Sequence, residues 1–210
     1  PGDGTVEYTP VTDNPESATF YMWVGPTLHK MLGVQGSIDW SLDAQGFPVG
    51  KGTWTGLFVQ PTGAVGRPAA DISAFVEPQI ATTAHTPVFT IDGVALVMQN
   101  WGLKMNNDVK QSLLIGRENI WISDRNEEIT ATVEATPLAT FNPFLLAENR
   151  TRVPMILQHG SVVGKRVKFE APLCALKRPG YTQIDNKAGW PLAMRPMPDA
   201  GDDQWKITLT

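Results

Sequence analysis

Hydrophobic and polar residues alternate at intervals of two along several short segments of the chain. Ile38, Trp40 and Leu42 are separated by serine and aspartate residues, and in an extended chain this spacing places the large side chains on one face. The same alternation recurs at residues 167–169 and 205–209. We therefore predict half-buried β-strands at these three places. Further strands are predicted over residues 19–24, 52–59, 88–91, 119–123, 129–134 and 188–195.

Turn residues separate these predicted strands throughout the chain. The strands are short and rich in Thr, Val, Ile and Trp, and 19 Gly and 17 Pro lie mostly between them, a pattern typical of a sandwich or barrel. A single segment predicts a helix: Asn142 can cap it, Pro143 suits the first helical position, and residues 144–148 complete it. The sequence thus predicts a mainly β fold with one short flanking helix that closes one end of a sheet.

The segment between residues 60 and 86 differs from its surroundings. It is rich in Pro, Ala, Gly and Thr without any period, which predicts a long extended connection of the kind that often serves function or assembly. Residues 25–42 and 160–177 share a turn glycine, a lysine five positions later and an alternating strand. This echo, unless it arises by chance, predicts two tandem β modules. Their bounds would be 1–64 for an incomplete first module, 65–86 for a connecting arm and 87–210 for the second module.

Composition narrows the class of protein. The chain has 210 residues, enough for one large or two small domains, and its formal charge of -4 with scattered Lys and Arg argues against a general nucleic-acid binder. Apolar runs are too short to predict membrane insertion. Cys174 is the only cysteine, so an intramolecular disulfide is excluded, and this suits assembly in a reducing cytoplasm.

The residues that usually carry catalysis or bind metals are not arranged in known motifs. His29, His85 and His159 lie in unrelated contexts without the spacing of a zinc site, and no Gly-x-Ser-x-Gly elbow occurs. Residues 46–51 and 160–165 end in Gly-Lys, but both are one residue shorter than a phosphate-binding loop and their flanks predict β-hairpins. We therefore predict no enzyme activity, no catalytic residues, no metal and no cofactor.

Tryptophans and clustered acids each allow two interpretations. The seven tryptophans suit a sugar-binding platform or a core and subunit interface, and the apolar register of Trp40 and Trp205 favours the second. The clustered acids suit a catalytic pair, solvated turns or an acidic surface that faces a DNA path, and their Gly, Asn and Pro neighbours favour turns. These acids are Asp124, Glu127 and Glu128, then Asp199, Asp202 and Asp203.

Strand and turn motifs occur in a particular order along most of the chain. They are residues 28–38 (LHKMLGVQGSI), Ser41-Leu42, Phe47-Pro48, residues 55–58 (TGLF), residues 170–173 (EAPL), Pro179-Gly180-Tyr181 and residues 198–210 with Gly201-Asp202-Asp203 before the last strand. In their order and spacing they resemble the major tail tube proteins of siphophages, the long-tailed bacteriophages.

The resemblance implies a tail-tube-type β-sandwich or barrel whose inner sheet joins neighbouring subunits in a ring. The rings would stack around a tape-measure protein into a flexible, non-contractile tube, with tail terminator and distal tail proteins as further partners. DNA would pass through the lumen without specific binding. The protein would reside in the virion tail after assembly in the host cytoplasm, without membrane insertion. Similar proteins carry further sequence upstream with its own strand and short helix, and this chain departs from them there.

Ring size and the alternative function follow from the same observations. Two modules per chain predict three subunits in a pseudo-sixfold ring, whereas one module per chain predicts six. An exposed strand edge is a liability unless another chain pairs with it, which suits a ring. The alternative is an immunoglobulin-like virion decoration or a receptor- or carbohydrate-binding module, which the tryptophan content also permits.

Overall fold

The computed structural model describes residues 4–63 and 65–210 of the protein. The chain is mainly β with one short helix among these residues, as predicted. Its elements are β1 (Val6–Tyr8), β2 (Ala18–Val24), β3 (Thr27–Asp43), β4 (Val49–Thr62), β5 (Val88–Ile91), β6 (Val94–Ala95), β7 (Met98–Lys104), β8 (Asp108–Leu114), β9 (Arg117–Asp124), β10 (Glu128–Glu134), α1 (Pro143–Glu148), β11 (Arg152–His159), β12 (Val167–Leu176), β13 (Thr182–Ile184), β14 (Lys187–Pro196) and β15 (Lys206–Leu209).

One antiparallel sheet of 13 strands contains every described strand except the β8–β9 hairpin. Its order is β2-β3-β7-β10-β14-β12-β11-β5-β6, with β4 beside β3, β13 beside β14, and β15 beside β12 and β1. Residues 39–43 of β3 pair with residues 100–104 of β7, so the ladder runs from the first part of the chain into the rest. The division into two copies, with bounds at 64 and 86, stays a prediction.

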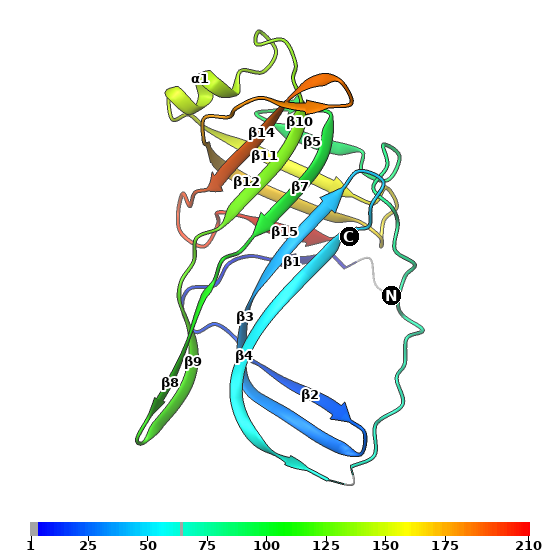
Figure 1. The fold of residues 1–210 in the computed structure, drawn as a ribbon, viewed down its shortest axis with the longest axis vertical. Coiled ribbons are helices and arrows are strands. Elements are labelled where there is room, and N and C mark those ends of the chain that lie inside the picture. The colour runs from blue at the N-terminus through cyan, green and yellow to red at the C-terminus, as the bar shows by residue number, and fades with distance from the viewer. Residues whose placement is uncertain (1–3, 64) are drawn as a thin grey trace.

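The sheet folds over itself and encloses the hydrophobic core. In Figure 1, β3, β7 and β10 cross in front of β11, β12 and β15. Most core side chains lie on β7, β10, β11 and β12, together with β5 and β14. Leu103 on β7, Ile129 on β10 and Met155 on β11 are 0% exposed, and Trp190 on β14 is 2% exposed. Alternate residues of β10 and β14 are buried, which is the period of two that the sequence predicted.

The helix α1 forms at the predicted position for the predicted reason. The Asn142 side chain accepts a hydrogen bond from the backbone N–H of Leu145 at 3.0 Å, and Pro143 occupies the first turn. Phe144 packs edge-to-face against Trp190, with ring centroids 6.2 Å apart. The helix therefore covers one end of the core, at the top of Figure 1. No helix in the described part of the chain has the length and apolar character needed to cross a bilayer.

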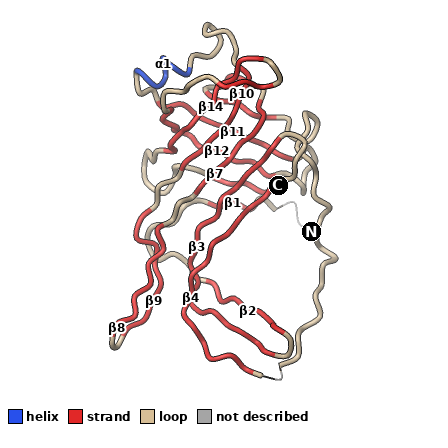
Figure 2. The backbone as a smooth tube through the Cα atoms, viewed as in Figure 1, coloured by secondary structure: helices blue, strands red, loops and turns tan. Residues whose placement is uncertain are grey.

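Two extensions project beyond the core (Figure 2). The first, which we call the wing, consists of residues 18–36 and 54–62, that is β2 with the paired parts of β3 and β4. Register shifts interrupt the β3–β4 ladder between Leu32 and Gln35, where Gly33 has a φ of +59°. The second extension is the β8–β9 hairpin. Residues 65–86 contain no helix or strand and lead back from the wing to β5.

A truncation in the core should destabilise the whole sheet. We expect Leu103→Ala to lower the free energy of unfolding by about 2–5 kcal/mol, because a fully buried side chain would leave a cavity between the two layers. Denaturant unfolding followed by tryptophan fluorescence measures this change. The matched control is Leu113→Ala, whose side chain is 61% exposed on the hairpin, with an expected change within about 0.5 kcal/mol.

Candidate assembly surface

One face of the wing is lined by large apolar side chains that have no covering layer in the monomer. Phe20, Met22 and Val24 lie on the same face of β2, because side chains along a strand alternate between faces. Phe20 pairs with Met31 of β3, which pairs with Phe58 of β4, so these residues form a row across the three strands. Met22 is 59% exposed and Phe58 is 78% exposed.

A few side chains give the wing internal support. Trp54 packs edge-to-face against Phe20, with ring centroids 5.2 Å apart, and Val34 beneath them is only 2% exposed. Gly56 permits this packing, because a Cβ there would lie 2.8 Å from the Val34 side chain. The remaining apolar side chains stay in water at an energetic cost, since transfer of such groups from water is favourable. Exposed apolar faces are typical of interaction sites, which makes this face the candidate site of the molecule.

The hairpin and the connecting segment also present apolar side chains to solvent. At the hairpin tip, Leu113, Leu114 and Ile115 are all exposed, and Gly116 has a φ of +89° that suits the tight turn. In the segment of residues 65–86, Phe75 is 81% exposed. The segment that we predicted as an assembly arm therefore does contain an unprotected aromatic ring.

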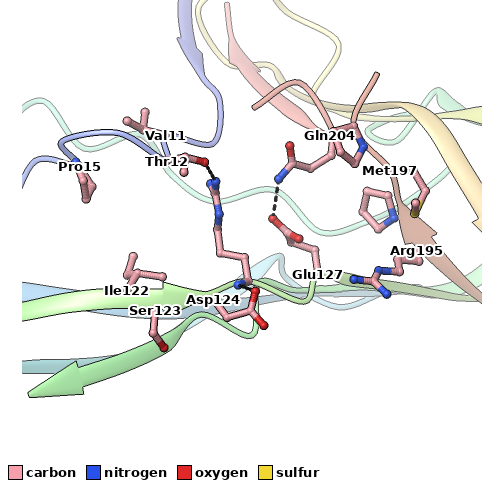
Figure 3. A pocket seen from close by; sticks show the side chains of 13 residues that line it. Val11, Thr12, Pro15, Ile122, Ser123, Asp124, Glu127, Arg195, Met197 and Gln204 are labelled. Carbon is pink, nitrogen blue, oxygen red and sulfur yellow. Dashed lines mark hydrogen bonds between the residues drawn. The ribbon is translucent and has the colours of Figure 1, made fainter. Parts of the chain in front are cut away.

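A cluster of polar side chains, which we call the clasp, fastens the N-terminal segment to the rest of the fold. Asp202 accepts a hydrogen bond from the backbone N–H of Thr12 at 2.8 Å and forms an ion pair with Arg125 at 2.8 Å. Arg125 also donates to the Thr12 hydroxyl. Asp202 thus links the N-terminal segment to Arg125, the residue that follows β9. Thr12 and Arg125 themselves line a pocket of about 360 Å³, and Figure 3 shows Thr12 among its lining residues. The bonds from Thr12 and then from Arg125 lower the pKa of Asp202.

Of the first acidic cluster, Glu127 is buried beside this pocket, against the C-terminal chain. Glu127 is only 7% exposed and accepts hydrogen bonds from Gln204 Nε2 at 3.0 Å and Trp205 Nε1 at 3.3 Å; Figure 3 shows its carboxylate pointing to Gln204. The prediction of a solvated turn is therefore wrong for Glu127, because the C-terminal chain folds back over it. Asp199 does lie in an exposed turn, and the half-buried Asp203 accepts hydrogen bonds from two backbone N–H groups of that turn.

Two of the three histidines, His85 and His159, lie near each other, and His29 lies elsewhere. His159 Nδ1 lies 3.0 Å from the hydroxyl of Thr86, beside His85, and burial lowers the pKa of His159, with a smaller effect in the same direction from His85. His29 lies on the wing, opposite Met22. Among the described residues, no group of three or more His, Cys, Asp or Glu side chains is placed to hold a metal ion.

Both glycine loops that end in Gly-Lys join antiparallel strands, as their flanks predicted. Residues 46–51 lead from β3 into β4, and residues 160–165 lead from β11 into β12. Gly160 has a φ of +90°, and a Cβ there would lie 2.1 Å from the carbonyl oxygen of Lys165. Its role is therefore to close the turn.

The tryptophans divide between the core and the extensions. Trp205 is 7% exposed and Trp40 packs against the core, so both lie inward as their register predicted. Trp54 on the wing and Trp121 on the hairpin are 41% and 40% exposed. Sequence reasoning predicted strands over residues 19–24 and 52–59 of the wing, but it did not predict the β3 part over residues 27–36 or identify the apolar face. A signal was present, since the run ATFYMWV of β2 is apolar on both sides.

The comparisons with known proteins found no match: neither a protein-family model nor a curated protein corresponds to this chain.

The clasp predicts a local effect on the N-terminal segment. We expect Asp202→Ala to speed hydrogen exchange at the Thr12 amide, because that N–H loses its acceptor. The unfolding temperature should change little, because the half-buried ion pair with Arg125 lies at the surface, where such pairs contribute about 1 kcal/mol. Asp199→Ala in the same turn is the matched control. Unchanged exchange at Thr12 in Asp202→Ala would contradict the clasp.

The same carboxylate sets a pH dependence. Because the pKa of Asp202 in the folded protein is below its ordinary value, its contribution to stability is present above the unfolded pKa and is lost as pH falls through the folded pKa. Protection of the Thr12 amide should therefore fall in acid, after correction for intrinsic exchange, and Asp202→Asn should remove this pH dependence.

Proposed function

We propose that the protein is a structural subunit of a phage tail tube, which associates with copies of itself into stacked rings around a tape-measure protein and a channel for DNA. The observation that carries the proposal is the apolar face of the wing, which is built from ordered strands and lacks a covering layer. A monomer that kept Met22 and Phe58 in water would lose stabilisation that association restores.

The shape of the molecule supports self-association. The wing and the hairpin extend away from the core, and residues 65–86 connect the wing back to it (Figures 1 and 2). All three parts present exposed apolar side chains. Extensions of this kind allow each copy to contact several others, as a closed ring that stacks on further rings requires. The strand and turn motifs follow one another in an order that resembles siphophage tail tube proteins. This resemblance is the reason for proposing a tail tube as the kind of assembly.

The charge of the chain is compatible with a DNA channel. The formal net charge is -4, and repulsion between a net negative wall and DNA phosphates would let DNA slide without adhering. The virion tail, with assembly in the host cytoplasm, is the location that follows from this proposal, and tail terminator and distal tail proteins are its further partners.

Replacement of one wing residue tests the proposal. We expect Phe58→Ser to reduce assembly at least tenfold at a fixed protein concentration, because it removes the most exposed aromatic ring of the apolar face while leaving the core intact. Sedimentation velocity and negative-stain electron microscopy measure assembly, and the unfolding temperature checks the fold. Val162→Ser, at a 55% exposed position in the β11–β12 loop, is the matched control and should assemble like the wild type.

Electron microscopy of the wild-type protein gives the direct test. Stacked rings with a central hole wide enough for duplex DNA, about 20 Å or more judging by the groove dimensions of B-DNA, are the expected result, and their symmetry distinguishes three from six subunits. A compact monomer at high concentration, with or without a tape-measure partner, would overturn the proposal in favour of a binding module.

A further inference from the structure

Strand β1 lies on the outer edge of the sheet and has little to hold it there. It pairs with β15 at three positions, Val6 with Leu209, Glu7 with Thr208 and Tyr8 with Ile207, and all three β1 residues are exposed. Between residues 4 and 17, only Pro10 is buried. A segment with so few buried contacts opens at a low free-energy cost relative to global unfolding.

The other attachments of this segment are polar and partly in water. Lys206 on β15 forms an ion pair with Glu7 at 3.1 Å, and the clasp joins Thr12 to Asp202 and Arg125. Exposed ion pairs are weak and exchange readily with solvent. Release of β1 would leave one side of β15 without backbone partners, and such an edge accepts another strand.

We infer that the free side of β15 is a strand-acceptor site, and that in the assembled protein it is occupied by β1 of a second copy. This inference rests on the proposed self-association and specifies one of its contacts. The proposed exchange retains the whole β1–β15 ladder, because the incoming β1 pairs in the same register. Glu7 of the incoming copy then forms the ion pair with Lys206 in place of the chain's own Glu7. Exchange of an identical element is a low-cost route to association.

The connection between β1 and β2 has the length and composition that exchange requires. Residues 9–17 carry no helix or strand, and nine extended residues span roughly 30 Å. Pro10 and Pro15 within it restrict the backbone and disfavour the α region at the residues before them, which keeps the segment extended. Once the wings hold two copies together, the tethered strand reaches its neighbour at a high effective concentration.

Charge complementarity favours a copy of this chain over an unrelated peptide. The acceptor edge presents Lys206, flanked by Glu170 at 3.9 Å, and the segment 6–8 places its single carboxylate opposite that ammonium group. The ion pair between Glu7 and Lys206 would re-form across the interface, so the incoming strand would recover the charged attachment that the outgoing strand gives up. An unrelated apolar strand would gain only the backbone hydrogen bonds with β15, without the ion pair.

Cysteine pairs placed across this ladder test the inference. Val6 and Leu209 face each other in the register, and single variants Val6→Cys and Leu209→Cys would be made with different affinity tags. The native Cys174 does not interfere, because burial raises the pKa of its thiol to about 12. The two variants are mixed, allowed to assemble and oxidised, and the products are separated under denaturing, non-reducing conditions.

The expected result is a disulfide-linked pair that carries both tags, since residues 6 and 209 then belong to different copies. Tyr181→Cys mixed with Leu209→Cys is the control, with an exposed thiol on the β13 side of the fold, and should give no such pair. The double variant Val6→Cys/Leu209→Cys should likewise form interchain products.

Two outcomes would overturn the inference, and electron microscopy of the same samples separates them. Assembled rings in which the double variant forms only an intrachain disulfide would show that β1 stays on its own chain, while self-association holds. Monomers with only the intrachain disulfide would overturn both the exchange and the proposed function.

Discussion

The antiparallel ladder between β3 and β7 is the interaction on which the arrangement of the molecule depends. Residues 39–43 of β3 are tied to the core through β7, whereas the first part of the same strand lies in the wing. Because a paired strand satisfies its backbone groups wherever it runs, β3 can leave the core without breaking its ladder with β4. The wing is therefore ordered although it covers no core of its own.

The two kinds of attachment in the molecule differ in physical character. The core and the wing face depend on apolar side chains, which favour exclusion of water whether the partner is the same chain or another. The N-terminal segment depends on backbone pairing and exposed charges, which are weakened by salt and by acid. On our proposals, the first kind brings copies together, and the second lets a short strand change partners without unfolding the core.

Much of the fold could be predicted from the sequence because its signals are local. Alternation at Ile38, Trp40 and Leu42 reflects the two faces of one strand, and Asn142 with Pro143 reflects the hydrogen-bonding needs of one helix end. The clasp and the burial of Glu127 could not be predicted in this way. They join residues 77 positions or more apart, and the pairing depends on how the C-terminal chain folds back. The exposed face of β2 could not be predicted either, because the sequence does not show which side of the strand stays uncovered.

The length of β3 has a mechanical consequence. Its 17 residues form one continuous strand from the wing to the core, so a load applied to the wing along the strand direction reaches the β3–β7 ladder in shear. In this geometry the hydrogen bonds of the ladder stretch together and share the load, whereas strands peeled from one end would break them one by one. A neighbouring subunit that binds the wing and pulls along the strand would therefore load the sheet in the direction in which it resists force best.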